Sequence, residues 1–441
     1  MKIHLIAIGG SAMHNMALAL HQKGFEVSGS DDAIFSPSRE RLESYNLLPT
    51  EMGWFPNKIT SDLDAIILGM HAREENPELA KAKELNIPIY SYPEYIYQQS
   101  KHKKRVVIGG SHGKTSITAM ILHVLQNLYI DCDYMVGAQL EGFDTMVKLT
   151  HEAPIIILEG DEYLSSPIDR RPKFHLYQPH IAVISGIAWD HINVFPNFDM
   201  YIDQFRIFKN MVTETLIYCS QDEELKKLAK EKTNCQLIPY NTPTHSIVNG
   251  ITTVDNTELI IFGNHNLQNL NAAKLVCNEL GVTNSDFFLQ IANFKGASMR
   301  LELVKKTAIS AVYKDFAHSP SKLKATSSAM KKQFSNRKLV ACMELHTFSS
   351  LSEKFLKEYK KSMDEPDVAI VYFSPKAIAH KKIDPITPIQ VITAFDRKDL
   401  LVFTDSEKLE KYLRNLNWKE MNLLMMSSGN FNGINMENLI D

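Results

Sequence analysis

The sequence predicts an α/β protein that is built from three successive domains. Short apolar runs alternate with helical patterns along the whole chain, which is typical of parallel sheets covered by helices. The alternation restarts near residues 100 and 297. We therefore expect domains at residues 1–100, 101–297 and 298–441.

The composition excludes several classes of protein. Of the 441 residues, 44% are hydrophobic and 22% are charged, and the net charge is −3, so neither a nucleic-acid partner nor a disordered chain is expected. No apolar run approaches the roughly 18 residues of a membrane-spanning helix, so no membrane insertion is expected. The N-terminus lacks a signal-peptide pattern. The five cysteines form no Cys-x-x-Cys motif, which favours reduced thiols and a cytoplasmic location.

The first part reads as a small parallel sheet with helices. Its apolar runs are short and end at Gly, Ser or Asp, as expected of buried strands that lead into turns. Strands are predicted at 3–9, 25–31 and 63–70, a helix at 12–24, and a helix, a Pro turn and another strand within 77–96. The basic run KHKKR (101–105) reads as a solvated connector.

The other two parts repeat the pattern. In the second part, strands are predicted at 105–109, 153–163 and 181–192, with a helix at 262–281. In the third part, strands are predicted at 308–317, 338–345, 367–374 and 421–429.

The stretch RVVIGGSHGKTS (105–116) is predicted to be a phosphate-binding loop between a strand and a helix. Its glycines would let backbone N–H groups converge on phosphate oxygens at the helix N-terminus. Lys114 would neutralise phosphate charge, and the Thr115 hydroxyl would bind Mg²⁺. The general pattern G-x-x-x-x-G-K-[ST] needs glycine at position 108, where this chain has Ile108. The alternative is an ordinary strand-to-helix turn.

Two predicted strands of the second part end in side chains that suggest a metal site. LEGDE (158–162) puts Glu159 at the end of a strand, where ligands of open parallel sheets bind. A carboxylate there suits Mg²⁺, and an acidic surface turn is the alternative. His191 lies at the end of the next predicted strand. Because Mg²⁺ prefers oxygen ligands, the residues alone favour a hydrogen-bonded polar role for His191.

Polar side chains elsewhere could contact a nucleotide. GNHNLQNLNAA (263–273) begins a helix with His265, Asn266 and Asn269, which could read an adenine edge, although helix capping explains them equally well. Asp315 ends a strand before a Pro turn, a position where a carboxylate often contacts a ribose hydroxyl.

The turn AIGGSAM (7–13) after the first strand could accept a diphosphate. The dinucleotide pattern G-x-G-x-x-G would fall on Ala7, Gly9 and Ala12, and the loss of two glycines argues against NAD. Ser11 and the helix start could still hold a diphosphate. SGSD (28–31) follows the second strand, where a base or sugar would lie. A domain without a ligand is the alternative.

Together these motifs resemble the Mur ligase family, the ATP-dependent amide-forming enzymes of peptidoglycan synthesis. GGSHGKTS resembles the family's T-G-T-x-G-K-T-T loop, which also lacks the upstream glycine. EGDE, DHINVFP, GNHNLQNLNAA, FKGASMRLE and DFAHSP resemble the five motifs that follow it in family order. The resemblance implies a Rossmann-like UDP-sugar-binding domain, a central P-loop ATPase domain and a Rossmann-like C-terminal domain that binds an amino acid or peptide.

The resemblance also implies roles for individual residues. The implied catalytic residues are Lys114, Glu159, His191 and Arg300. The implied ATP-binding residues are Gly110, Ser111, His112, Gly113, Lys114, Thr115, Ser116, His265, Asn266, Asn269, Arg300 and Asp315. The implied Mg²⁺ ligands are Thr115, Glu159 and His191. The implied UDP-sugar contacts are Gly9, Gly10, Ser11, Ser30, Asp31 and His71.

Departures from the family pattern bear on which branch of the family the chain resembles, and so on its substrate. Some members carry a carbamylated lysine about fifteen residues beyond the metal-binding histidine, where this chain has Arg206, and this favours ligases that act directly on UDP-N-acetylmuramate. Met299 replaces the first arginine of the usual pair, and Ser319 replaces a second histidine.

Two branches act on UDP-N-acetylmuramate. One adds L-alanine, and the other adds the murein tripeptide L-alanyl-γ-D-glutamyl-meso-diaminopimelate in recycling. The end LLMMSSGNFNGI (423–434) resembles the recycling branch, so the tripeptide is expected, with L-alanine as the alternative. In both branches the lactyl carboxylate would become an acyl phosphate. A non-catalytic regulator that binds ATP or a UDP-sugar is the alternative of a different class.

Overall fold

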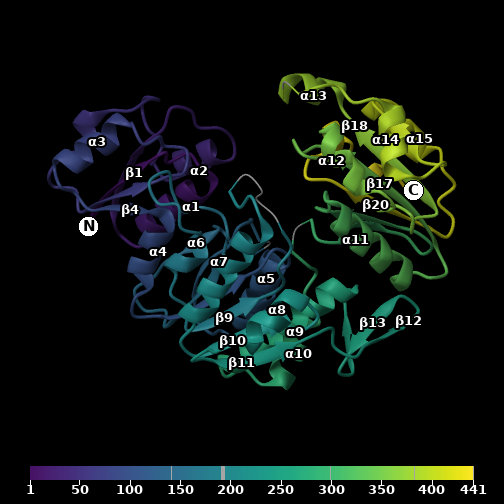
Figure 1. Ribbon diagram of the computed structural model, residues 1–441, viewed down its shortest axis with the longest axis horizontal. Coiled ribbons are helices and arrows are strands. Elements are labelled where there is room, and N and C mark those ends of the chain that lie inside the picture. The colour runs from purple at the N-terminus through teal and green to yellow at the C-terminus, as the bar shows by residue number, and fades with distance from the viewer. Residues whose placement is uncertain (141, 190–193, 298, 382, 441) are drawn as a thin grey trace. The chain divides into compact units, whose positions relative to one another are not determined.

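The chain folds as two compact units, whose helices and strands are labelled in Figure 1. The computed structural model describes residues 1–140, 142–189, 194–297, 299–381 and 383–440. One unit comprises Met1–Asn241 with Gln268–Ile291, and the other comprises Thr242–Leu267 with Ala292–Asp441. The predicted α/β class is confirmed, because parallel pairing dominates the three largest sheets. The three-domain division at 100 and 297 stays a prediction.

A four-stranded parallel sheet in the order β2-β1-β3-β4 begins the first unit. Its strands are β1 Lys2–Ile6, β2 Glu26–Ser30, β3 Ala65–Leu68 and β4 Ile89–Ser91, and the helices are α1 Ser11–Gln22, α2 Ser38–Ser44, α3 Pro77–Glu84 and α4 Tyr92–Ser100. The strand predicted after the Pro turn is short because α4 follows at once. Ser91 and Glu94 form a capping box there, which specifies a helix start.

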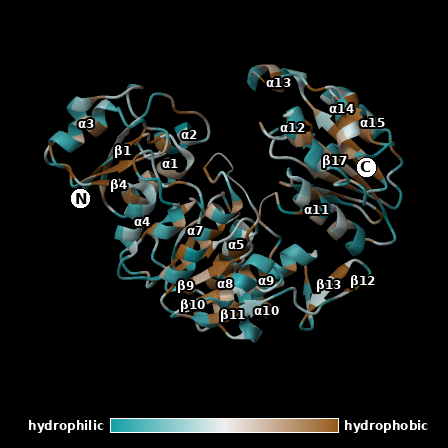
Figure 2. Ribbon diagram, viewed as in Figure 1, coloured by the Kyte–Doolittle hydropathy of each residue, from teal (hydrophilic) through white to brown (hydrophobic). Residues whose placement is uncertain are grey.

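A seven-stranded sheet in the order β11-β10-β9-β5-β8-β6-β7 follows, and β7 runs antiparallel to β6. Its strands are β5 Lys104–Gly109, β6 Asp133–Met135, β7 Val147–Lys148, β8 Ile155–Glu159, β9 Ile181–Ile184, β10 Thr215–Cys219 and β11 Gln236–Tyr240. The helices are α5 Lys114–Asn127, α6 Lys173–Leu176, α7 Phe198–Met211, α8 Glu223–Lys230, α9 Asn264–Glu279 and α10 Asn284–Ile291. Figure 2 shows the hydrophobic character of strands β9 and β10, whose sequences are IAVI and TLIYC.

The second unit holds a six-stranded sheet in the order β15-β16-β20-β17-β18-β19 and a small antiparallel sheet β12-β13-β14. The large sheet comprises β15 Glu302–Lys306, β16 Ala311–Asp315, β17 Lys338–Leu345, β18 Val368–Phe373, β19 Leu401–Phe403 and β20 Met421–Met426, and the small one comprises β12 Ser246–Val248, β13 Ile251–Val254 and β14 Thr257–Leu259. The helices are α11 Pro320–Gln333, α12 Glu353–Leu356, α13 Pro375–Lys381, α14 Pro388–Phe395 and α15 Ser406–Arg414.

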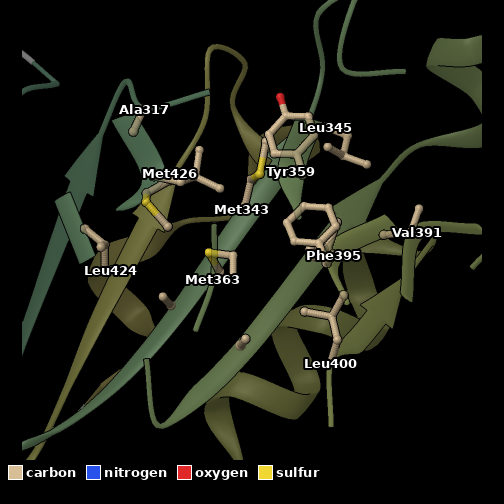
Figure 3. Packing of buried hydrophobic residues seen from close by; sticks show 14 of the residues in the cluster. Ala317, Met343, Leu345, Tyr359, Met363, Val391, Phe395, Leu400, Leu424 and Met426 are labelled. Carbon is tan, nitrogen blue, oxygen red and sulfur yellow. The ribbon is translucent and has the colours of Figure 1, made fainter. Parts of the chain in front are cut away.

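Apolar side chains bury one face of the large sheet of the second unit (Figure 3). Met343 and Met426 from neighbouring strands lie in the same cluster as Tyr359 and Phe395. The rings of Tyr359 and Phe395 stack with centroids 5.1 Å apart. The small sheet is tied to α11 by Gln333, which accepts a bond from Thr252 Oγ1 (2.8 Å) and donates one to Gly250 O (2.8 Å).

The basic run KHKKR is a solvated connector only in part: it links α4 to β5, and Lys101 and His102 are exposed, but Lys103 and Arg105 are buried. Lys103 is buried and pairs with the fully buried Asp133 at 2.7 Å. The Arg105 guanidinium is also buried, and its Nη1 donates to the carbonyl oxygens of Ser100 (2.9 Å) and Lys101 (3.1 Å). Buried charges are tolerated because they are paired and hydrogen-bonded. Arg105 therefore fixes the end of α4 to the start of β5, and Lys103 ties the same connection to β6.

No helix in the described ranges has both the length and the apolar character needed to cross a membrane.

The adjacent lysines 103 and 104 allow a matched test of the buried pair. Lys103→Ala should lower the free energy of unfolding of the first unit by about 3 kcal/mol, because Asp133 would stay buried without its counter-charge. Lys104→Ala should cost less than about 1 kcal/mol, since the Lys104 and Glu214 side chains are 41% and 42% exposed. Urea unfolding of both variants measures the difference, and equal losses would contradict the role given to Lys103.

Candidate active site

The predicted phosphate loop connects β5 to α5. Ile108, the residue that breaks the general pattern, is fully buried within β5 and is in register with Glu159 of β8 and Val183 of β9. The turn therefore begins only after this position. A glycine is not needed at 108, because the residue belongs to the strand.

Two loop glycines are required by their backbone and by close neighbours. Gly110 and Gly113 have φ angles of +122° and +80°, a region that favours glycine. A Cβ atom at Gly110 would lie 2.7 Å from Ser185 N, and one at Gly113 would overlap Asn269 Oδ1. The segment after β9 and the helix α9 thus contact the loop closely at Gly110 and Gly113.

The loop is also pinned by hydrogen bonds to the segment after β9. Ser111 N donates to Gly186 O (2.9 Å), and Ala188 N donates to Ser111 Oγ (2.9 Å). Ser185 Oγ donates to the carbonyl oxygen of His112. Ser116 is buried in the first turn of α5. The loop is therefore held in shape by its protein neighbours.

Lys114 lies across this loop. Its Nζ donates to Gly110 O at 2.7 Å and to Glu162 Oε2 at 2.7 Å. Burial lowers the pKa of Lys114, but the carboxylates of Glu162 and Asp161 outweigh that effect, and the pKa lies above its ordinary value. Lys114 is thus a permanent cation at the N-terminus of α5, where anions bind readily.

Thr115 and Glu159 form a second polar pair beside the loop. Thr115 Oγ1 donates to Glu159 Oε1 (2.8 Å), and Gly137 N donates to Oε2 (2.8 Å). Burial raises the pKa of Glu159, and these two donors partly offset the rise. A hydroxyl and a carboxylate oxygen are ordinary Mg²⁺ ligands, so these side chains fit the predicted metal. A nearby cation would favour the ionised carboxylate that burial disfavours.

The third predicted metal ligand, His191, lies outside the described residues, together with its neighbour Asp190. Within the described ranges, no group of three His, Cys, Asp or Glu side chains could hold a metal ion.

The predicted adenine-contacting residues lie on the first turns of α9. Asn269 is buried, and its side chain lies so close to Gly113 that a Cβ atom there would overlap it. Asn266 is buried too, and its Nδ2 donates to Phe262 O (3.0 Å), which is a local backbone contact. Burial lowers the pKa of His265, and the Asp315 carboxylate opposes the change.

Arg300 and Asp315 lie together in the second unit. Asp315 is buried, and its two oxygens accept bonds from Leu301 N and Ala317 N, both at 2.7 Å. Burial raises its pKa, which His265 and these donors oppose. The Arg300 guanidinium lies over the Phe316 ring, 4.8 Å from its centroid. The residues on either side of Arg300 in the sequence, Met299 and Leu301, have φ angles of +55° and +49°. Asp315 thus holds the strained turn that presents Arg300.

The predicted UDP-sugar residues gather at one edge of the first sheet. Gly9, Gly10 and Ser11 follow β1, Ser30 and Asp31 lie at the end of β2, and the exposed His71 follows β3. These three strands are parallel neighbours, so their carboxyl ends meet at the same edge. Asp31 Oδ2 accepts a bond from Gly9 N (2.7 Å), and burial raises the Asp31 pKa. Asp31 therefore shapes the turn after β1.

The sequence motifs did not point to Tyr201, whose hydroxyl contacts Ser111 Oγ (2.9 Å) and Glu162 Oε1 (3.1 Å). It lies on α7, about forty residues beyond the acidic motif, and no local pattern marks it. Arg206, further along α7, pairs with Glu231 at 3.1 Å.

Comparison with known proteins places the chain in a family. Residues 2–104 match the model of the Mur ligase family catalytic domain, and residues 108–277 match the Mur ligase middle domain. The chain is 30% identical over 384 residues to the UDP-N-acetylmuramate–L-alanine ligase of Sulfurihydrogenibium sp. (strain YO3AOP1), covering 84% of this chain and 82% of that protein.

Solved structures share the fold. A UDP-N-acetylmuramate–alanine ligase from Thermotoga maritima has a TM-score of 0.70 at 20% identity, with 98% of this chain and 96% of that chain covered. A murein peptide ligase from Psychrobacter arcticus 273-4 has a TM-score of 0.64 at 20% identity, with 100% and 98% covered. With the family models and the relative above, these findings show that the chain belongs to the Mur ligase family of ATP-dependent acid–amino-acid ligases.

Proposed function

We propose that the chain is a cytoplasmic ligase that joins the lactyl carboxylate of UDP-N-acetylmuramate to the amine of L-alanine in peptidoglycan synthesis. The observation that carries the proposal is the cation of Lys114, which lies across a compact loop between Gly110 O and Glu162. Thr115 and Glu159 are paired beside it. This arrangement suits a bound triphosphate.

The chemistry must bring two anions together. A carboxylate oxygen attacks the γ-phosphorus of ATP, the bond from phosphorus to the bridging oxygen breaks, and ADP leaves. Lys114, the loop N–H groups and the N-terminus of α5 would stabilise the charge that collects on the phosphoryl oxygens. Arg300 is proposed to add a second cation from the second unit.

The acyl phosphate then reacts with the amine. The free amine attacks the acyl carbon, the tetrahedral adduct expels phosphate, and the proton lost by the nitrogen leaves with the phosphate as HPO4²⁻. Because water would hydrolyse the acyl phosphate, the reaction needs a site from which water is excluded. We assign no proton-transfer role to His318, whose Nδ1 lies 2.7 Å from Phe316 O.

Mg²⁺ would be held by Thr115 and Glu159, with His191 as a proposed third ligand. When bound, the ion would neutralise phosphate charge and orient the γ-phosphoryl group. The UDP moiety is proposed to bind at the edge of the first sheet formed by Gly9, Gly10, Ser11, Ser30, Asp31 and His71, and the adenosine near His265, Asn266, Asn269 and Asp315.

The choice of L-alanine rests on relatives. Sequence relatives at 28–30% identity are named L-alanine ligases, and this favours L-alanine over the tripeptide that the C-terminal motif predicted. The tripeptide remains a second candidate because of SSGNFNGI (427–434). There, Glu344 of β17 accepts bonds from Phe431 N (2.9 Å) and from Ser427 Oγ, and it holds this end of β20.

An amine panel decides between the two candidates. Purified protein with UDP-N-acetylmuramate, ATP and Mg²⁺ is offered L-alanine, L-alanyl-γ-D-glutamate, the tripeptide or the tetrapeptide, and phosphate release is measured. The proposal expects release with L-alanine that requires both the sugar nucleotide and the amine. Release with the tripeptide but with no other amine would replace it by the second candidate, and the absence of phosphate release with every amine would favour a non-catalytic nucleotide-binding protein.

Removal of the loop cation tests the phosphate site. Lys114→Ala should reduce amine-dependent phosphate release by about 10³-fold, because charge on the transferred phosphoryl group loses its nearest cation. Binding of UDP-N-acetylmuramate, measured by calorimetry, should stay within about twofold of the wild type, since Lys114 lies in a different sheet's loop. The control is Lys148→Ala, which removes an exposed lysine paired with Asp131. Turnover retained in Lys114→Ala would refute this site.

A comparison of two glycines with similar φ angles can distinguish the effect of backbone strain from the effect of a steric overlap with a neighbouring side chain. Gly113 and Gly24 have φ angles of +80° and +89°, but no atom lies within 4 Å of a Cβ built at Gly24. Gly24→Ala should cost about 1 kcal/mol of stability, and Gly113→Ala should cost more, because its methyl group also overlaps Asn269. Only Gly113→Ala should lower kcat/KM for ATP, by about 100-fold, because the methyl group must displace Asn269 or the loop. Steady-state kinetics of both variants measure this, and equal effects would contradict it.

A further inference from the structure

We propose that Tyr201 is a positioning residue for the phosphate-binding cation: its hydroxyl holds Glu162, which in turn holds Lys114 across the loop. The inference rests on the proposed function in one respect, namely that Lys114 binds the phosphates of ATP. None of the family motifs in the sequence includes Tyr201, whose hydroxyl lies within hydrogen-bonding distance of the loop residue Ser111.

The side chain of Tyr201 is fixed by packing. It is fully buried on α7. Its ring lies 5.5 Å from Phe195 and 5.2 Å from Phe205, measured between centroids. Aromatic neighbours on both sides leave the ring little freedom. The hydroxyl is therefore delivered to a set position between Ser111 and Glu162.

The direction of the hydrogen bonds follows from the chemistry of the partners. Glu162 pairs with Lys114 at 2.7 Å, and a carboxylate can only accept. The single proton of Tyr201 is therefore donated to Glu162 Oε1 at 3.1 Å. Ser111 Oγ, which lies 2.9 Å from the Tyr201 oxygen, must then donate its own proton to Tyr201. The chain of bonds runs from Ser111 through Tyr201 to Glu162, and Lys114 meets it from the other side.

Because Tyr201 donates to Glu162 and Glu162 pairs with Lys114, the position of the Lys114 ammonium group depends on Tyr201. The Glu162 side chain is 2% exposed and that of Lys114 is 15% exposed, so water cannot readily replace a lost donor. Without the tyrosine hydroxyl, Oε1 of Glu162 loses a hydrogen bond that helps to fix the rotation of the carboxylate. Lys114 would then shift with the carboxylate to which it is paired. Ser111, which belongs to the loop, would lose the Tyr201 oxygen as its hydrogen-bond acceptor. Both changes affect the place where ATP phosphates are proposed to bind.

The chain offers a matched control. Tyr177 is also fully buried, but its hydroxyl has no hydrogen-bond partner in the part of the chain that the structure describes. Tyr201→Phe and Tyr177→Phe thus remove the same atom from similarly buried rings. Only the first breaks bonds to the loop and to Glu162.

The experiment measures kcat/KM for ATP and for UDP-N-acetylmuramate, the affinity for the ATP analogue AMP-PNP, and the melting temperature. Tyr201→Phe should lower kcat/KM for ATP by about tenfold, as expected for loss of a hydrogen bond to a charged group. It should leave the KM for UDP-N-acetylmuramate within about twofold. Tyr177→Phe should leave every kinetic value within about twofold.

A double-mutant cycle separates positioning from structure. In a Glu162→Gln background, Tyr201→Phe should have little further effect, because the group through which it acts is already altered. An equal loss with and without Glu162→Gln, or a Tyr201→Phe variant that behaves like Tyr177→Phe, would overturn the inference. If the wild type releases no phosphate with any amine, the proposed function fails separately. AMP-PNP affinity then still tests Tyr201.

Discussion

A buried ammonium group must be paired, and this requirement organises the first unit around Lys114. The cation is largely withdrawn from water, so a carboxylate and a carbonyl must hold it. Glu162 can do so because β8 lies next to β5 in the sheet, which brings the acidic segment after β8 to the loop after β5. Thr115 and Glu159 meet for the same reason. Strand order is therefore the physical cause of the site, and the loop glycines allow its close contacts.

Much of this arrangement could be predicted from sequence. The buried strands were readable because they are short apolar runs bounded by turn residues, and parallel strands gather their carboxyl ends at one edge. The resemblance to the Mur ligases grouped Glu159 with Thr115 and Asp31 with Gly9, and in the structure each pair is joined by a hydrogen bond. The compact loop was predicted as well. Its physical reason, the burial of Ile108 within β5, required the structure.

Other features left no local signal. A run of basic residues normally lies in solvent, and only the fold shows that Lys103 meets Asp133, thirty positions along the chain, inside the protein. Tyr201 contributes through a hydroxyl whose partners are distant in sequence. The strands β12, β14 and β19 have three residues each, too few for a periodic pattern. Glu302–Lys306, which forms β15, carries charges that hide its pairing with β16.

The course of the chain between the two units limits how the protein can be divided. The chain passes between the units at three points, after residues 241, 267 and 291, and the second of these lies within the single helix α9. A gene fragment that began at residue 298 would omit the small sheet, and Gln333 of α11 would lose Thr252 and Gly250 as partners. The C-terminal unit is therefore not an independent cassette. Moving it into another protein would require residues 242–267 to travel with it.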